Sequence, residues 1–235
     1  MNTILYLIRH SVKLNIRVDL DHAVFDRIQP LSALGEQRAA ALLQIDELRH
    51  ADAAYASPFS RTISTLRYLL EEDKLTLQLD ERLRELEFGA MPDVGPSDPT
   101  DKPKKAAPPT HAEYMDQRPK PGAENDIRAR QWKDHDLAAE GGESIRQCRE
   151  RMTAAMTDIA KQNPGKKVLV GSHGAAIGSF LTGYYTDLED DFIRNIGQPD
   201  IFRLTYDHDF CLIDATRIPT GLEDVPHHGH PQDAR

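Results

Sequence analysis

Cysteine is scarce in this sequence, which argues against a disulfide scaffold. The 235 residues include two cysteines, Cys148 and Cys211, and these do not form a close pair. Disulfide frameworks and cysteine-based zinc sites need several cysteines at short spacing. We interpret both residues as buried small hydrophobic side chains, Cys148 on an apolar helical stripe and Cys211 in an apolar run. This usage fits a reducing cytoplasm, where we expect the protein.

Long apolar runs are also missing. The first apolar run, Thr3 to Ile8, is cut by Arg9 after a few residues. A membrane-spanning helix needs about 20 apolar residues, and a signal peptide carries a longer apolar core between recognisable flanks. We therefore expect neither a signal peptide nor a membrane span.

Positive charge is in deficit. Lysine and arginine total 29 against 38 for aspartate and glutamate, which gives a formal net charge of −9. Duplex nucleic acid and anionic membranes are bound by surfaces on which basic residues dominate. We expect neither as a partner, whereas a local basic pocket for a small anion stays compatible with this charge. The sequence leaves the oligomeric state open between monomer and homodimer.

The length of the chain fits one domain that carries a large insertion. Between Ala90 and about Gly142 prolines recur, and a loop of this length in a compact domain is functional or disordered. We expect a single domain over residues 1–225, with an inserted cap segment at about 90–142 that is partly helical and anchored by Trp132. A flexible tail is expected over residues 226–235.

Short apolar runs bounded by polar residues and glycine predict buried strands of a parallel sheet. Such runs lie at residues 3–8, 53–56 and 167–172, and an alternating run lies at 75–79. Helical patterns follow Ser32 and the pair Ser57-Pro58, whose serines are expected as N-caps, and Gly141-Gly142-Glu143-Ser144 starts the clearest helix. Residues 201–213 predict a hairpin, and a short helical piece is expected within 11–29. The fold class is therefore α/β.

Two of the predicted strands end in a histidine. The first is followed by Arg9-His10 and the run at 167–172 by His173. Ligands of open α/β sheets bind beyond the carboxyl ends of the strands, so two imidazoles and a guanidinium are expected to face one crevice. For either histidine alone, an unrelated residue at a strand end is the simpler interpretation. The repeated pattern, with an arginine beside it, favours a shared site.

Arg61 falls in the first turn of the helix predicted after Ser57-Pro58. A cation at this position opposes the helix macrodipole, which favours anions there. Taken alone, a solvated surface arginine is the better interpretation. With an anion bound, free backbone N–H groups and the guanidinium would converge on it.

Five short motifs, taken in order, resemble the histidine phosphatase superfamily, whose members include cofactor-dependent phosphoglycerate mutases and many small phosphomonoesterases. The motifs span nearly the whole chain outside the insertion and the tail: Leu7-Ile8-Arg9-His10, Pro30-Leu31-Ser32-Ala33-Leu34-Gly35, Ser57-Pro58-Phe59-Ser60-Arg61-Thr62, Leu83-Arg84-Glu85-Leu86-Glu87-Phe88-Gly89 and Gly171-Ser172-His173-Gly174. Each motif alone is weak, but five in this order are specific. The resemblance implies a three-layer α/β/α sandwich with a mostly parallel central sheet.

The resemblance also implies a mechanism. His10 is expected to be the nucleophile, because a neutral imidazole is available at physiological pH and forms a phosphohistidine. Arg9, Arg61 and His173 are expected to bind the phosphoryl group, whose charge is stabilised by fixed cations and N–H donors. Glu85 aligns with the family's proton donor.

Further roles follow from the same resemblance. Glu87 is the alternative proton donor, and Gly174 joins the expected substrate-binding residues. Asn15 is expected to replace the family's nearby asparagine, although its spacing is one residue short. Because arginines neutralise the phosphate charge, we expect no metal ion and no cofactor.

The sequence departs from the family at Ser11-Val12-Lys13, where glycine, glutamate or glutamine, and threonine are usual. This change argues against a phosphoglycerate mutase, which closely preserves the loop. We expect a metal-independent phosphomonoester hydrolase that acts on a small phosphorylated substrate. The alternatives are a phosphoglycerate-mutase-like phosphotransferase and a phosphate-binding scaffold with reduced catalysis.

Overall fold

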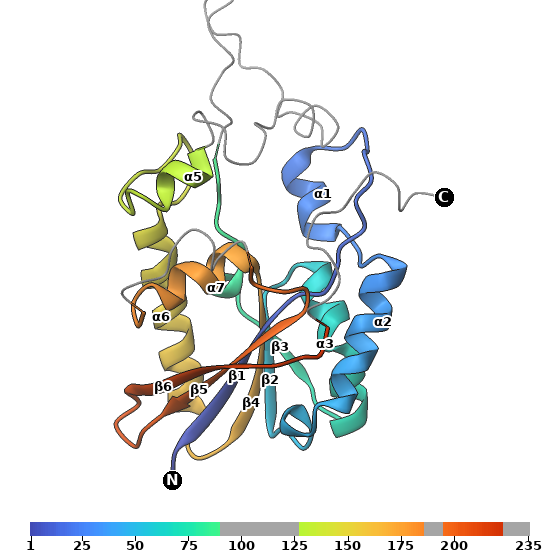
Figure 1. The fold of residues 1–235 in the computed structure, drawn as a ribbon, viewed down its shortest axis with the longest axis vertical. Helices are drawn as coiled ribbons and strands as arrows, with labels where there is room; N and C mark the ends of the chain where they lie inside the picture. The colour runs from blue at the N-terminus through green and yellow to red at the C-terminus, as the bar shows by residue number, and fades with distance from the viewer. Residues whose placement is uncertain (90–126, 186–194, 223–235) are drawn as a thin grey trace, which may run out of the picture.

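Six strands form one central sheet in the computed structural model, which describes residues 1–89, 127–185 and 195–222 (Figure 1). The strands are β1 (Thr3–Arg9), β2 (Ala53–Ala56), β3 (Leu77–Leu79), β4 (Lys167–Ser172), β5 (Asp200–Tyr206) and β6 (Leu212–Ile218), in the order β3-β2-β4-β1-β5-β6. The first four in that order are parallel, and β5 and β6 are antiparallel to their neighbours. The expected mostly parallel sheet is confirmed.

Helices cover both faces of this sheet, which confirms the expected three-layer α/β/α sandwich. The helices are α1 (His22–Ile28), α2 (Ala33–Ala41), α3 (Ser60–Asp73), α5 (Ile127–Gln131), α6 (Ile145–Gln162) and α7 (Gly174–Leu181), with short 3₁₀ turns η1 (Leu42–Gln44), η2 (Asp46–Leu48) and η3 (Glu81–Leu83). Helices α2 and α3 lie on one face, and α6 and α7 on the other (Figure 1). Helices α1 and α5 stand at the end of the molecule toward which β1 runs.

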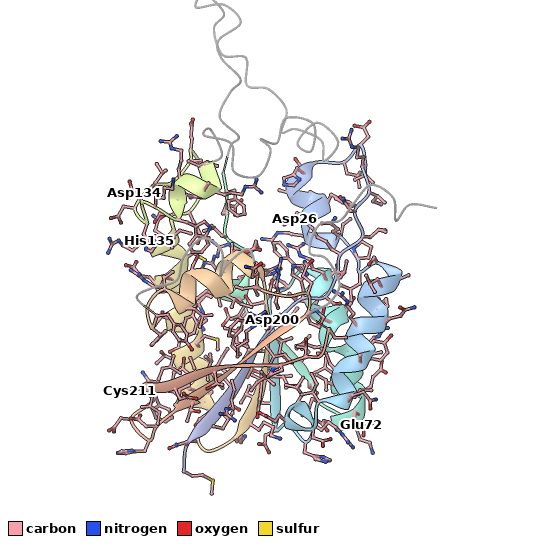
Figure 2. The ribbon with its side chains drawn as sticks, viewed as in Figure 1. Asp26, Glu72, Asp134, His135, Asp200 and Cys211 are labelled. Carbon is pink, nitrogen blue, oxygen red and sulfur yellow. The ribbon has the colours of Figure 1, made fainter. Side chains whose placement is uncertain are left out.

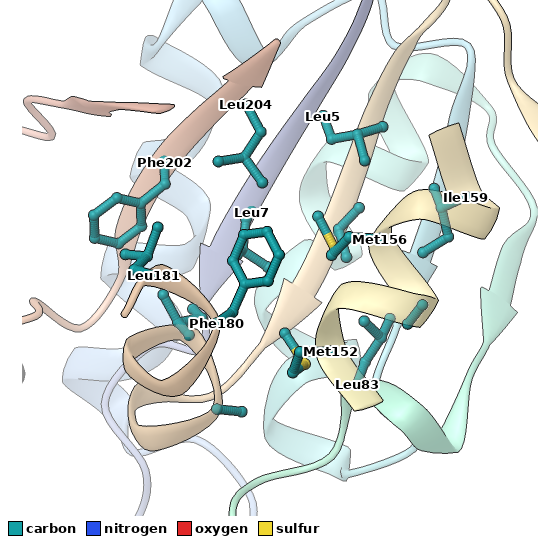
Figure 3. Packing of buried hydrophobic residues seen from close by; sticks show 14 of the residues in the cluster. Leu5, Leu7, Leu83, Met152, Met156, Ile159, Phe180, Leu181, Phe202 and Leu204 are labelled. Atoms are coloured by element: carbon teal, nitrogen blue, oxygen red, sulfur yellow. The ribbon is translucent and has the colours of Figure 1, made fainter. Parts of the chain in front are cut away.

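The alternation of β1 explains why a continuous apolar run forms it. Successive side chains of a strand point to opposite faces, so both faces of a central strand need apolar residues. Leu5 and Leu7 pack in the cluster beside α6 and α7 (Figure 3), whereas Tyr6 and Ile8 join the cluster with residues of η1 and α3. This two-sided burial fixes where β1 ends and therefore where Arg9 and His10 stand.

Helix α6 forms as its pattern predicts. Ser144 is the N-cap and makes a reciprocal capping box with Gln147, which satisfies N–H groups at the start of the helix. Its apolar stripe, which includes Cys148 and Met152, is buried against the sheet. The prediction for Cys211 is wrong, because this residue is exposed in the connection between β5 and β6.

Helix α3 begins later than predicted. Ser57 and Pro58 are not its N-cap and first residue, because the helix starts at Ser60 and Phe59 occupies the cap position without a side-chain hydrogen bond. The backbone N–H of Ser57 donates instead to Gly171 O, at 3.0 Å, so Ser57 prolongs the pairing of β2 with β4. Arg61 stays in the first turn of the helix, as predicted.

The predicted insertion and tail are only partly within the described residues. Residues 90–126 and 223–235 lie outside them, and so does most of the expected cap segment and the whole of the expected 226–235 tail. The described remainder of the insertion contains α5, and Trp132 packs against the larger core cluster. Within the described ranges, no helix has both the length and the apolar composition that a bilayer span needs.

Candidate active site

Three neighbouring parallel strands, β2, β4 and β1, end at the same edge of the sheet. The backbone N–H of His10 donates to Ser172 O at 3.0 Å, so the residue after β1 lies beside the last residue of β4. The ring centroids of His10 and His173 are 5.2 Å apart. The sequence separates these histidines by most of the chain, but the parallel pairing brings their rings into contact distance, as the strand-end pattern predicted.

The hydrogen bonding of His10 defines which ring nitrogen is available for chemistry. Nδ1 lies 2.8 Å from the backbone oxygen of Ser11. A carbonyl oxygen only accepts, so the neutral ring carries its proton on Nδ1 and its lone pair on Nε2. Burial, followed by the charges of Arg61 and Arg9, lowers the pKa of His10 well below its ordinary 6.5. His10 is therefore neutral at pH 7.

His173 is fully buried beside His10. Its Nε2 lies 2.8 Å from the hydroxyl of Ser57, and Phe59 packs its ring edge-to-face at 4.9 Å. Its pKa is likewise lowered well below 6.5, first by burial and then by the charge of Arg61. Its Nδ1 is buried and has no hydrogen-bond partner among the described residues. Such an atom costs free energy unless a ligand or water satisfies it.

Arg9 closes one side of the site from the end of β1. Its guanidinium donates to the carbonyl oxygens of Ile196 and, at 3.4 Å, Gly197. It also lies directly on the backbone of Gly174, where an added Cβ would stand 2.9 Å from the Arg9 Cζ. Gly174 is the first residue of α7, so a side chain at this position would displace the guanidinium. The close approach accounts for a glycine there.

Arg61 is buried, with 2% of its surface exposed, so the interpretation as a surface arginine is wrong. Its Nη1 and Nη2 lie 3.2 and 3.3 Å from the two carboxylate oxygens of Asp26, and its Cζ stacks 4.8 Å from the Phe59 ring centroid. Burial alone would raise the pKa of Asp26, but the charges of Arg61 and Lys13 outweigh it and lower that pKa. Asp26 therefore stays ionised.

Asp26 is a functional candidate that sequence reasoning missed. It belongs to α1 and lies at the end of the molecule where this helix stands above the strand ends (Figure 2). The stretch that contains it is mixed in charge and has no clean period, so no pattern marks it. The Nζ of Lys13 lies 4.0 Å from the same carboxylate. The residue that departs from the family pattern thus adds a second cation beside Arg61.

Glu85 and Glu87 both line the pocket, which has a volume of about 460 Å³ and is also lined by His10, Arg9 and Arg61. The Glu85 carboxylate accepts backbone N–H groups from Leu86 and Ala176, each at 2.9 Å, the second at the start of α7. Glu87 is exposed. Volumes of about 300–1,000 Å³ are typical of small-molecule sites.

The structure thus gathers most of the expected site residues, and their roles stay predictions. His10, Arg9, Arg61, Glu85 and Gly174 line the pocket, and His173 packs against His10 without lining it. Asn15 is exposed and is not among the residues that line the pocket. Ser11 is fully buried and does not adopt a positive φ, so a serine fits where the family has glycine.

A possible metal-binding group lies at the other end of the sheet. In the part of the chain that the structure describes, Asp207, His208 and Asp209 could hold an ion between them. They follow Tyr206, which pairs with Thr3 at the beginning of β1, whereas the pocket lies at the end of that strand. This group therefore cannot contact a ligand of the pocket.

Comparison with known proteins agrees with the fold and the order of motifs. The sequence matches the family model of the histidine phosphatase superfamily (branch 1) over residues 5–217. Among curated proteins, none matches the sequence significantly.

Solved structures resemble the fold over nearly the full chain. A mycobacterial glucosyl-3-phosphoglycerate phosphatase matches with a TM-score of 0.62 and 21% identity, covering 92% of this chain and 97% of that one. A phosphoserine phosphatase from Entamoeba histolytica, in complex with phosphoserine, matches with a TM-score of 0.60 and 20% identity, covering 91% and 96%. The YhfR protein of Bacillus stearothermophilus matches with a TM-score of 0.60 and 22% identity, covering 96% and 98%. At these identities the likeness establishes the fold.

Because two buried histidines have lowered pKa values, we expect the protein to lose stability in mild acid. Because folding lowers the pKa of His10 and of His173, the unfolded chain binds protons at these positions below pH 6.5 that the folded chain does not. Stability is therefore present above that pH and is lost as the pH falls, by roughly 1.4 kcal/mol per pH unit for each histidine. Urea denaturation at pH 7.5 and 5.5 measures this loss. Between these two pH values the free energy of unfolding of the variant His10→Asn is expected to fall by less than that of the wild type. Equal losses would contradict a lowered pKa of His10 in the folded protein.

Proposed function

We propose that the chain, which belongs to the histidine phosphatase superfamily, is a metal-independent phosphomonoester hydrolase that forms a phosphohistidine on His10. The observation that carries this proposal is the state of His10. The Ser11 carbonyl holds its proton on Nδ1, so its Nε2 keeps a lone pair. Burial and the charges of Arg61 and Arg9 lower the pKa of its ring. A neutral nucleophile beside fixed cations suits attack on a phosphate anion.

In the first step, Nε2 of His10 attacks phosphorus and the bond from phosphorus to the ester oxygen breaks. Arg9 and Arg61, with His173 behind them, bind the three non-bridging oxygens, over which the charge spreads. Glu85 gives its proton to the departing oxygen, which leaves as an alcohol. The products are phosphohistidine and a Glu85 carboxylate.

In the second step, Glu85 acts as a base. Its carboxylate takes a proton from a water molecule, whose oxygen attacks phosphorus as the bond from phosphorus to Nε2 breaks. Inorganic phosphate leaves, His10 regains its lone pair and Glu85 is protonated again. Glu87, which lines the same pocket, is the alternative donor.

Binding of phosphate to this site involves competition with a carboxylate. Arg61 is paired with Asp26, so the phosphoryl oxygens must replace that carboxylate or share the guanidinium with it. Lys13, near the same carboxylate, remains to balance the Asp26 charge when Arg61 turns to phosphate. In this arrangement Arg61 supplies positive charge to the phosphate, and Lys13 supplies it to Asp26.

The names of the structural neighbours support phosphatase activity on a small substrate. One is a phosphatase of glucosyl-3-phosphoglycerate and another a phosphatase of phosphoserine. By analogy we propose a small phosphorylated molecule as the substrate of this chain. A phosphoglycerate-mutase-like phosphotransferase would use the same His10 chemistry, and it differs in a phosphoenzyme that survives water long enough to reach an acceptor.

A phosphate-binding scaffold with reduced catalysis is the second candidate. The departure at Ser11-Val12-Lys13 favours it, because the threonine hydroxyl that is usual in the family is missing there and Lys13 stands at that position, 4.0 Å from the Asp26 carboxylate. Such a protein would bind a phosphorylated partner without forming phosphohistidine, and the absence of a phosphoenzyme would identify it.

Hydrolysis of para-nitrophenyl phosphate tests the proposal. The wild type is expected to turn over this ester equally with and without a chelator, because arginines carry the charge. The rate of hydrolysis by the variant His10→Ala is expected to be lower by roughly 10³-fold or more, since this substitution removes the proposed nucleophile. A matched control is His208→Ala, which changes an exposed histidine in the hairpin turn at the other end of the sheet. No turnover by the wild type, or unaltered turnover by His10→Ala, would overturn the proposal.

Replacement of Gly174 by alanine tests the role of Arg9. The added Cβ would stand 2.9 Å from the Arg9 guanidinium, which is the far end of a flexible side chain, so we expect displacement of Arg9 with little loss of thermal stability. The inhibition constant of inorganic phosphate is expected to rise about tenfold, as for the loss of one charged hydrogen-bonding group. In an Arg9→Ala background the same substitution should raise the inhibition constant of phosphate little further. A full additional loss in that background would show that Gly174 acts independently of Arg9.

A further inference from the structure

The segment that carries Glu85 has no regular structure of its own. After η3, residues 84–89 belong to neither a helix nor a strand. A backbone without such hydrogen bonds holds a fixed position only where other groups bind it. The groups that bind this segment therefore decide where the Glu85 carboxylate stands.

Arg151, from the second turn of α6, binds two backbone carbonyl groups of this segment and one of η3 just before it. Its Nη1 donates to the backbone oxygens of Arg82, at 2.6 Å, and Arg84, at 3.0 Å. Its Nη2 lies 3.4 Å from the backbone oxygen of Glu85 itself. One guanidinium thus binds the backbone from three residues before Glu85 up to Glu85 itself.

Glu143, which precedes the N-cap of α6, holds both Arg151 and the other side of the segment. Its carboxylate accepts a hydrogen bond from Nε of Arg151, at 2.8 Å, and another from Nη2 of Arg84, at 2.9 Å. It also accepts the backbone N–H of Glu87 at 3.2 Å, and its own N–H donates to Glu87 O at 2.7 Å. The side chains of Glu143 and Arg151 are 14% and 11% exposed, so water competes little for these bonds.

The two residues act on the site through the backbone of the Glu85 segment and through the side chain of Arg84, which lines the pocket. Neither of them lines the pocket, whereas Glu85 does. The Glu85 carboxylate is anchored separately, by N–H groups at the start of α7. Its position is therefore set from two sides, by α7 at the carboxylate and by the Glu143–Arg151 pair at the backbone.

We propose that Glu143 and Arg151 form a clamp that positions Glu85 for proton transfer to the leaving group. The inference rests on the proposed function, because it takes Glu85 as the proton donor. Both are positioning residues, and their removal would let Glu85 shift relative to the ester oxygen. A displacement of about 1 Å in a catalytic geometry can cost about 10²-fold in rate.

A comparison of leaving groups separates this role from a structural one. Phenolate is a poor leaving group that needs a proton as it departs, whereas 2,4-dinitrophenolate leaves without one. The ratio kcat/KM covers events up to the transfer of phosphate to His10, so the later attack of water does not affect it. Damage to proton donation lowers kcat/KM for phenyl phosphate alone, and damage to phosphate binding lowers it for both esters.

The variants Glu143→Gln and Arg151→Met are expected to lower kcat/KM for phenyl phosphate by about 10- to 100-fold, and by less than about threefold for 2,4-dinitrophenyl phosphate. Arg151→Lys, which keeps the charge but not the fork of donors, should recover part of the loss and serves if Arg151→Met does not fold. The matched control is Asp158→Asn. Asp158 lies on the same helix and binds the Arg82 side chain at 2.7 Å without touching the backbone of the segment, so both ratios should stay unchanged.

Equal losses on the two esters, or no loss on either, would overturn the clamp. Glu85→Gln provides the reference, since it is expected to show the same selectivity with a larger loss on phenyl phosphate. If Glu85→Gln is unselective, Glu85 is not the donor and the clamp has no role. A wild type that hydrolyses neither ester, or a His10→Ala variant that keeps its activity, would instead count against the proposed function, so the two failures are distinguishable.

Discussion

Burial of two imidazoles beside guanidinium groups is the constraint on which the site depends. Desolvation and the charges of Arg61 and Arg9 hold His10 neutral, and the Ser11 carbonyl fixes its proton on Nδ1. The same burial leaves His173 Nδ1 and the Nε atoms of both arginines without a hydrogen-bond partner among the described residues. A phosphate brings negative charge and acceptor oxygens to such groups at once. The proposed nucleophile and the proposed anion site therefore depend on one electrostatic arrangement.

This arrangement arises because three parallel strands end at one edge of the sheet. The helices that begin there supply further groups to the site. Helix α7 begins at the glycine on which Arg9 lies, and its first N–H groups hold Glu85. Helix α3 supplies Arg61 from its first turn, and α1 supplies the Asp26 carboxylate that pairs with it. Asp26 and Lys13 make the resting pocket partly self-neutralised. In our account substrate binding includes the release of Arg61 from this pair, which gives the 11–29 loop a part in selecting the anion.

Much of this could be predicted because strand ends and motifs are local signals. The apolar run of β1 and the histidine after it indicated the sheet and the position of His10, and the motif order led to Arg61 and Glu85. What failed depended on contacts across the fold. Ser57 looked like a helix cap, but its N–H pairs with β4 and its hydroxyl with His173. Asp26 stands in a stretch with no distinguishing pattern, and Arg151 lies on a predicted helix but outside its apolar stripe. The groups that they bind across the fold, Arg61 and the backbone oxygens of Arg82, Arg84 and Glu85, lie 35 and 66–69 residues away in sequence.

A crystal structure of the protein with orthovanadate would show whether His10 and the two guanidinium groups converge on one phosphoryl group, because vanadate takes the geometry of a phosphoryl group in transfer. We expect vanadium bonded to Nε2 of His10, with its oxygens contacted by Arg9, Arg61 and His173, and Arg61 turned from Asp26 toward the anion. Vanadate bound away from His10, or bound there while Arg61 keeps its full pairing with Asp26 and makes no contact to it, would contradict the account.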